Sequence, residues 1–255
     1  MNKIIFLGTS AGVPTRFRNV SALALQPENS KAWILFDCGE GTQHQILKSP
    51  LSAYNLSTIF ITHLHGDHIY GLPGLLASRG MVQAQTPLEI YGPKGLKKII
   101  ETVMHHSQLH LPFDLKIVEI SKDMRIDLEQ LTIDVVELSH SISSYGYVVT
   151  FADKPGKLDV AKAKALGVPE GPLYAKLKKG ETITLPDGRS IDGTLLIGEP
   201  QKGKRIAIGG DNDTPLLFET FAPFDLMIHE ATYTQYDFDH LPRKFQHTTA
   251  KALAQ

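Results

Sequence analysis

The stretch from His63 to His68 constrains the fold of this chain more than any other. It reads His-Leu-His-Gly-Asp-His, so four side chains with nitrogen or oxygen ligands suited to zinc lie within six positions. An apolar, β-branched run, Ser57 to Thr62, precedes it, and a run typical of a helix, Ile69 to Arg79, follows it. The sequence therefore predicts a dense ligand set on a loop between a buried strand and a helix.

The spacing of the ligands within this loop favours two metal ions. Residues two apart on an extended strand point to the same side, so His63 and His65 can bind one ion. The turn that follows can direct Asp67 and His68 toward a second ion. Two ions about 3.5–4 Å apart stabilise both the entering and the leaving oxygen of a hydrolysis reaction. A loop of exposed, unrelated histidines is the alternative, and the density of ligands behind a buried-strand pattern disfavours it.

Other predicted strands also end in polar side chains. His140, Asp211 and the pair His229 and Glu230 each follow an apolar run, and a polar stretch near the end of the chain adds His247. A two-metal site needs a bridging carboxylate, and Asp211 is the preferred candidate because the glycines before it allow close backbone approach. Asp213 is the alternative.

Composition restricts the class of protein. The chain has 255 residues, which is enough for one large α/β domain, and its net charge of −1 means that nucleic-acid binding requires a local basic patch. Its one cysteine excludes an internal disulfide framework, and no apolar run approaches the roughly 20 residues of a membrane helix. We therefore expect a soluble, cytoplasmic protein with no membrane contact.

A basic insertion supplies such a patch. The breaker Asp153–Lys157 begins a segment, residues 153–200, in which Lys154 to Arg189 contains eight Lys or Arg against four Asp or Glu. No linker or repeat divides the rest, so we predict a single domain over residues 1–255 with this insertion inside it. A basic insertion suits contacts with a phosphate backbone, and a merely solvated insertion is the alternative.

Several motifs together resemble the ribonuclease Z family of the metallo-β-lactamase superfamily. They are residues 6–14, 18–20, 36–42, 63–68 and 229–232. The resemblance implies an αβ/βα sandwich of four layers with a protruding basic arm. The arm, which contains Gly171 and Pro172, would be a flexible exosite that binds transfer RNA.

The resemblance also implies a role for each site residue. The first zinc ion would be held by His63, His65 and His140, the second by Asp67 and His68, and Asp211 would bridge them. Asp67 would orient the attacking nucleophile, and His247 with Glu230 would protonate the leaving 3′ oxygen. His229 would support the site through hydrogen bonds. Substrate contacts would come from Arg18, Asn19, Gly171, Pro172, Lys176, Lys178 and Lys179.

The implied activity is that of a zinc-dependent phosphodiesterase, a homodimeric endoribonuclease that removes the 3′ trailer from precursor transfer RNA and leaves a 3′ hydroxyl. The sequence stops at Gln255 in the middle of a helical pattern. The family continues further and adds a last histidine ligand for the second zinc ion. A shortened, catalytically impaired protein that binds transfer RNA is therefore one alternative, and a general phosphodiesterase acting on small esters is another.

Overall fold

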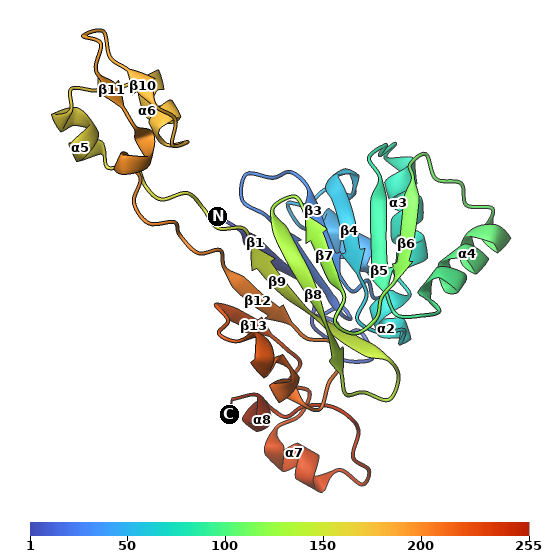
Figure 1. The fold of residues 1–255 in the computed structure, drawn as a ribbon. Coiled ribbons are helices and arrows are strands. Elements are labelled where there is room, and N and C mark those ends of the chain that lie inside the picture. The colour runs from blue at the N-terminus through green and yellow to red at the C-terminus, as the bar shows by residue number, and fades with distance from the viewer. Residues whose placement is uncertain (255) are drawn as a thin grey trace. The chain divides into compact units, whose positions relative to one another are not determined.

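The computed structural model describes residues 1–254 and divides the chain into two compact units (Figure 1). The main unit contains Met1–Val149 and the chain from Ile206 onward. The arm unit contains Thr150–Arg205, and the predicted basic insertion falls within it. Among residues 1–254, the structure contains no helix that is both long and apolar enough to cross a membrane.

The first sheet of the main unit has six strands in the order of the sequence. They are β1 (Lys3–Gly8), β2 (Ala22–Gln26), β3 (Trp33–Phe36), β4 (Leu56–Phe60), β5 (Leu88–Gly92) and β6 (Leu115–Glu119). Strands β1 to β3 form an antiparallel meander, whereas β3 to β6 run parallel. Because parallel strands present their carboxyl ends at one edge, the loop after β4 places the His63–His68 stretch at that edge.

The second sheet has five strands in the order β13-β12-β9-β8-β7. They are β7 (Arg125–Leu128), β8 (Leu131–Leu138), β9 (Ser144–Phe151), β12 (Arg205–Ile208) and β13 (Leu226–Ile228). The short strand β7 was not predicted from the sequence. Three other candidate site residues follow strands of this sheet: the predicted ligands His140 and Asp211 come after β8 and β12, and His229, predicted to support the site, comes after β13.

Aromatic side chains pack between the two sheets. The ring of Tyr147 on β9 lies with its centroid 5.7 Å from Phe36 on β3 and 5.0 Å from Phe60 on β4. The Tyr147 hydroxyl donates a hydrogen bond of 2.5 Å to the carbonyl of Ile61. This buried contact fixes the backbone two residues before His63, so the packing of the sheets positions the start of the metal loop.

Helical segments cover the outer faces of both sheets (Figure 1). Buried side chains of α1 (Thr42–Leu47), α3 (Leu72–Met81) and α4 (Leu96–Ser107) share one core with the first sheet. The 3₁₀ helix η3 (Pro215–Phe221) contributes Phe218 to a core with Val136, Val148 and Ala207 of the second sheet. The order of helix, sheet, sheet and helix confirms the predicted four-layer fold.

The helix predicted from Ile69 to Arg79 is interrupted. The helix α2 (Gly66–Ile69) ends before Gly71, and α3 begins after it. A Cβ atom at Gly71 would lie 2.1 Å from the carbonyl oxygen of Gly39, so the backbone turns here at a point where only glycine fits. The remaining elements of the main unit are η1 (Ala53–Asn55), α7 (Gln235–His240) and α8 (Ala250–Leu253).

The arm unit has a hydrophobic core of its own. Its elements are α5 (Val160–Ala165), α6 (Pro172–Leu177), β10 (Ile183–Thr184), β11 (Ser190–Ile191) and η2 (Gly193–Leu196). Buried residues from all five elements, among them Ala163, Leu177 and Ile191, form one cluster. The turn between β10 and β11 contains Pro186-Asp187-Gly188, residue types that are typical of turns.

Candidate metal centre

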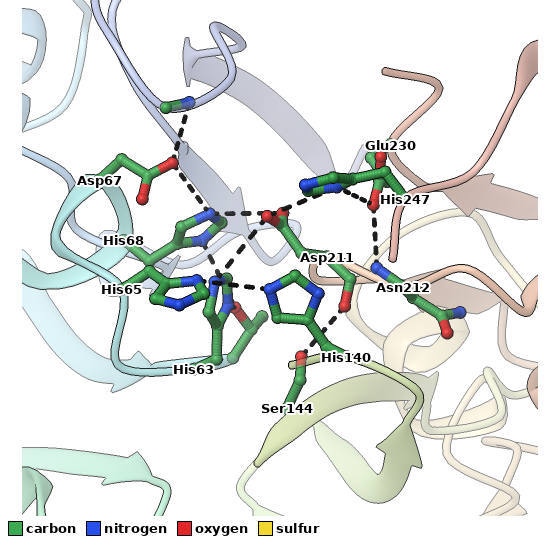
Figure 2. A network of polar contacts seen from close by, with 12 residues as sticks. His63, His65, Asp67, His68, His140, Ser144, Asp211, Asn212, Glu230 and His247 are labelled. Atoms are coloured by element: carbon green, nitrogen blue, oxygen red, sulfur yellow. Dashed lines mark hydrogen bonds and ion pairs between the residues drawn. The ribbon is translucent and has the colours of Figure 1, made fainter. Parts of the chain in front are cut away.

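Two groups of predicted metal ligands meet at the carboxyl ends of the strands (Figure 2), and a third group that could hold an ion, Asp211, Glu230 and His247, adjoins them. The first group is His63, His65 and His140, and the second is His63, His68 and Asp211. In each group, one ligand atom from every residue lies within 4.8 Å of the others. The first two groups share His63, so the structure gathers five of the six predicted metal ligands into one cluster.

The first group consists of three imidazoles. The Nε2 atom of His140 lies 3.3 Å from Nδ1 of His65, and Nδ1 of His140 donates a hydrogen bond of 3.1 Å to the carbonyl of Gln246. The lone pair of His140 Nε2 therefore faces His65. The Nε2 atom of His63 is buried and, among the described residues, has no hydrogen-bond partner. A buried nitrogen without a partner is costly, and a bound cation would satisfy it.

The second group is arranged around the carboxylate of Asp211. One oxygen, Oδ1, lies 3.4 Å from Nε2 of His68, and the other, Oδ2, lies 3.8 Å from Nε2 of His63. A carboxylate that presents one oxygen to each of two imidazoles has the arrangement of a bridging ligand. Asp213 is directed elsewhere, because its Oδ1 accepts a hydrogen bond of 2.7 Å from Thr214.

Asp67 lies beside the second group without being part of it. Its Oδ2 atom is 3.5 Å from Nε2 of His68 and accepts a hydrogen bond of 3.0 Å from the backbone NH of Gly12. Figure 2 shows the contact of Asp67 with His68 at the edge of the cluster. The loop that begins at Gly12 is attached to the metal loop through its hydrogen bond to Asp67.

The electrostatics of the cluster suit a cation. Burial, helped by the neighbouring His68, lowers the pKa of His63 to about 2, so that this ring is neutral. Burial raises the pKa of Asp211, but the hydrogen bond and charge of His68 outweigh burial and hold the pKa below its ordinary value. Burial likewise lowers the pKa of His68, whereas Asp37 and Asp211 raise it well above the usual range. The neutral ring of His63 next to the ionised carboxylate of Asp211 belongs to the donor set that zinc prefers.

A hydrogen-bonded histidine and glutamate lie next to Asp211. The Nδ1 atom of His247 donates a bond of 2.8 Å to Oε1 of Glu230 and lies 3.8 Å from Oδ2 of Asp211. The hydrogen bond that His247 donates to Glu230 raises the pKa of His247. Glu230 itself accepts hydrogen bonds from the backbone NH of Asn212, at 2.9 Å, and from the hydroxyl of Thr232. The pair therefore has a fixed position at the edge of the cluster.

His229 points away from the metal ligands. Its Nδ1 atom donates a hydrogen bond of 2.7 Å to the carbonyl of Glu230, and its Nε2 lies 3.1 Å from Nδ2 of Asn212. Both ring nitrogens are therefore occupied by protein contacts. This arrangement corresponds to the supporting role that the resemblance implies.

Two residues that support the metal ligands, Asp37 and Asn212, were not predicted from the sequence. Asp37 directly follows β3 and hydrogen bonds to His68, and Asn212 accepts a hydrogen bond of 3.2 Å from the backbone NH of Ser139, next to His140. Each lies just beyond an apolar strand. The rule that identified Asp211, a polar residue at the end of a buried strand, could have identified both.

The predicted substrate-binding residues fall in both units. Arg18 lines a cavity of about 410 Å³ in the main unit together with His68, Asp211 and Glu230. The side chain of Asn19 instead donates a hydrogen bond of 2.8 Å to the carbonyl of Glu40, so it holds the loop in place. The others lie in the arm unit, where all five are exposed: Gly171, Pro172, Lys176, Lys178 and Lys179.

Comparison with known proteins gives consistent matches over nearly the whole chain. A ribonuclease BN from Cronobacter sakazakii is 48% identical over 232 residues, which are 90% of this chain and 76% of that protein. A ribonuclease Z from Brevibacillus brevis is 44% identical over 254 residues, which are 99% of this chain and 80% of that protein. A family model described as Anti-Pycsar protein Apyc1 matches residues 2–156, so the chain also belongs to the group that this model defines.

Solved structures agree with these matches. The short form of human tRNase Z, ELAC1, superimposes with a TM-score of 0.70 at 30% identity and covers 100% of this chain and 86% of its own. The metallo-β-lactamase fold protein YhfI from Bacillus subtilis has a TM-score of 0.61 at 16% identity, covering 97% of this chain and 77% of its own, and supports the fold alone. The chain therefore belongs to the ribonuclease Z family of metal-dependent hydrolases, with the metallo-β-lactamase fold.

Proposed function

We propose that this protein is a zinc-dependent endoribonuclease that removes the 3′ trailer from precursor transfer RNA. One observation carries the proposal: the carboxylate of Asp211 lies between His63 and His68, with one oxygen toward each ring. This arrangement provides for two cations at a short, fixed separation, which is the requirement for hydrolysis of a phosphodiester. The names of the curated relatives support ribonuclease activity for such a site.

The ligand set fits zinc ions. We assign the first to His63, His65 and His140, the second to His68 and Asp67, and the bridge to Asp211. The unpartnered Nε2 of His63 and the short approach of His140 to His65 support this assignment. When bound, the ions supply activation of water and stabilisation of the charge on the phosphate. The remaining chemistry belongs to the side chains of the chain.

Two of these side chains have separate roles in the reaction. His247 is oriented by its hydrogen bond to Glu230 and lies next to Asp211, on the opposite side of that carboxylate from Asp67 (Figure 2). We assign it the transfer of a proton to the leaving 3′ oxygen, and we assign to Asp67 the orientation of the attacking water. The resulting products are transfer RNA with a 3′ hydroxyl and a trailer with a 5′ phosphate.

The loop around Phe17 is suited to unpaired RNA. Arg16 and Arg18 are exposed and have no ion pair within residues 1–254, and Phe17 between them is 95% exposed. The hydroxyl of Thr15 accepts hydrogen bonds from the backbone of Phe17 and Arg18, so the loop has a defined shape. Guanidinium groups bind phosphates and an aromatic ring stacks on bases. The attachment of Gly12 to Asp67 joins this loop to the metal centre.

A processing assay tests the proposal. The purified protein is incubated with zinc and a precursor transfer RNA that carries a 3′ extension, and the ends of both products are mapped. We expect one cut at the trailer, with a 3′ hydroxyl on the transfer RNA. Hydrolysis of bis(p-nitrophenyl) phosphate without cleavage of the precursor would instead indicate a general phosphodiesterase. Binding of the precursor without either reaction would indicate a non-catalytic RNA-binding protein.

Three exposed lysines of the arm unit are proposed to bind the phosphate backbone of the substrate. Replacing Lys176, Lys178 and Lys179 together with alanine should raise KM for precursor transfer RNA about tenfold and reduce its salt dependence, with kcat unchanged. The matched control replaces three exposed lysines of the main unit, Lys97, Lys98 and Lys122. An equal rise in KM for both variants would contradict a specific role of the arm.

We further propose that the protein is a homodimer in the cytoplasm. Exposed apolar side chains support association, because Leu47 and Met81 are each 82% exposed at the ends of α1 and α3. The single, buried cysteine is compatible with a reducing compartment. Sedimentation equilibrium measures the mass in solution directly.

A further inference from the structure

A basic and aromatic segment, residues 243–245, lies on the surface directly before His247. It consists of Arg243, Lys244 and Phe245, all of them exposed, and the ring of Phe245 is 49% exposed. The guanidinium of Arg243 lies 5.8 Å from the centroid of that ring and, within residues 1–254, takes part in no ion pair or hydrogen bond. An exposed ring beside such a guanidinium offers one group that stacks on a base and one that binds a phosphate.

The segment is attached to the metal centre through its backbone. The NH of His247 donates a hydrogen bond of 2.9 Å to the carbonyl of Phe245, which closes a three-residue turn. The carbonyl of the middle residue, Gln246, accepts a hydrogen bond of 3.1 Å from Nδ1 of His140, a predicted metal ligand. Phe245 is therefore only one tight turn away from His247, and the turn itself contacts the first ligand group.

Tyr233 supports both the segment and His247. Its ring centroid lies 5.9 Å from that of Phe238 and 6.3 Å from that of His247. The ammonium of Lys244 lies 4.4 Å from the centroid of Phe238 and donates a hydrogen bond to the carbonyl of the same residue. Lys244 is therefore held against α7, whereas its two neighbours in the segment remain available to a ligand.

The direction of the reaction determines which part of the RNA reaches this segment. A cut that leaves a 3′ hydroxyl expels the 3′ oxygen of the nucleotide on its 5′ side, and in an in-line displacement the water attacks from the opposite side of the phosphorus. In the proposed function, His247 protonates that oxygen and Asp67 orients the water. These two side chains lie on opposite sides of Asp211 (Figure 2). The last nucleotide of the transfer RNA therefore lies on the side of His247, next to Phe245.

We propose that Arg243 and Phe245 bind this last nucleotide: Phe245 stacks on its base, and Arg243 binds the phosphate on its 5′ side. The inference rests on the proposed function, because the assignment of His247 to the leaving oxygen sets the direction of the RNA. A stacked ring contacts only the face of a base, so the surface accepts any of the four bases at this position.

Variants of Phe245, combined with an altered substrate, test the stack. Phe245→Ala should raise KM for the precursor about tenfold, whereas Phe245→Trp, which keeps a flat ring, should retain the wild-type value. An abasic residue at the last transfer RNA position should raise KM of the wild type by a similar factor and should cost the alanine variant nothing further. The control is an abasic residue at the first trailer position, whose effect should be equal in both proteins. Losses that multiply at the last transfer RNA position would overturn the stack.

Arg243→Ala tests the phosphate contact. KM should rise about fivefold, and the slope of log KM against log salt concentration should fall by about one. Lys244→Ala is the matched control, because it removes the same charge at the next position from a side chain that α7 already holds. It should change KM less than about twofold. Equal rises in KM for the two variants would contradict a specific contact of Arg243.

Photochemical cross-linking locates the nucleotide without requiring cleavage. The probe is a precursor transfer RNA with an uncleavable methylphosphonate at the cut and 4-thiouridine on one side of it. We expect cross-links to residues 243–245 from the last transfer RNA nucleotide and none from the first trailer nucleotide. The reverse pattern, in a protein that cleaves the unmodified precursor, would overturn the inference and leave the proposed function intact. The expected pattern in a protein that cleaves no precursor would contradict the proposed function alone.

Discussion

Replacing Asp211 with alanine should lower kcat/KM for precursor transfer RNA by about a thousandfold or more, because electrostatic stabilisation of the transition state and the bridge between the cations are lost together. The side chain contacts His63 and His68 with different oxygens, so no neighbouring carboxylate can replace it without moving the backbone. The number of zinc ions bound per chain should fall as well. Steady-state kinetics with metal analysis of the same sample measures both effects.

The matched control for Asp211 is Asp213→Ala. Asp213 lies two positions further on, is also partly buried, and hydrogen bonds to Thr214 away from the cluster. Its loss should change kcat/KM less than about threefold, as expected for a residue that contacts neither metal ligands nor substrate. A large loss of activity in Asp213→Ala, with Asp211→Ala near the wild type, would show that the bridging ligand had been assigned to the wrong residue.

Replacing His247 with alanine should lower kcat for precursor transfer RNA about 10²- to 10³-fold, because the leaving 3′ oxygen is a strong base and loses its proton donor. The same variant should hydrolyse bis(p-nitrophenyl) phosphate at a rate within about threefold of the wild type, since p-nitrophenolate departs without a proton. The comparison of the two substrates separates a role in proton transfer from a role in holding the fold or the metals.

His240→Ala is the control for this experiment. His240 belongs to α7, is exposed, and donates a hydrogen bond of 2.7 Å to the carbonyl of Tyr236 within the same helix. It should behave like the wild type on both substrates. Equal losses on both substrates in His247→Ala would contradict proton donation and indicate that His247 supports the metal centre instead.

Most of the fold and the metal ligands could be predicted because they depend on local patterns. Apolar runs followed by polar side chains mark the carboxyl ends of β4, β8 and β12, and the packing of the two sheets in the sandwich brings these ends together. The sequence predicted His63, His140 and Asp211 in this way. It left Asp211 and Asp213 as alternatives, because only the folded backbone determines which carboxylate faces the imidazoles.

The features that were not predicted depend on contacts between distant segments. The position of Asp37 after β3 marks it as a candidate, but nothing local indicates that its carboxylate lies 2.7 Å from His68, 31 positions away. The interruption between α2 and α3 follows from the approach of Gly71 to the carbonyl of Gly39. The strand β7 is only four residues long and alternates charged and apolar residues, so its pairing with β8 determines its conformation.

Removal of the metal tests most directly whether the cluster is a catalytic metal centre. Precursor transfer RNA cleavage is measured with the protein as purified, after exhaustive treatment with a chelator, and after zinc is added back. The arrangement of His63, His68 and Asp211 predicts that cleavage falls to background when metal analysis finds no bound ion, and that zinc restores it. Cleavage that continues undiminished in protein shown to contain no metal would contradict the claim that this cluster is a catalytic metal centre.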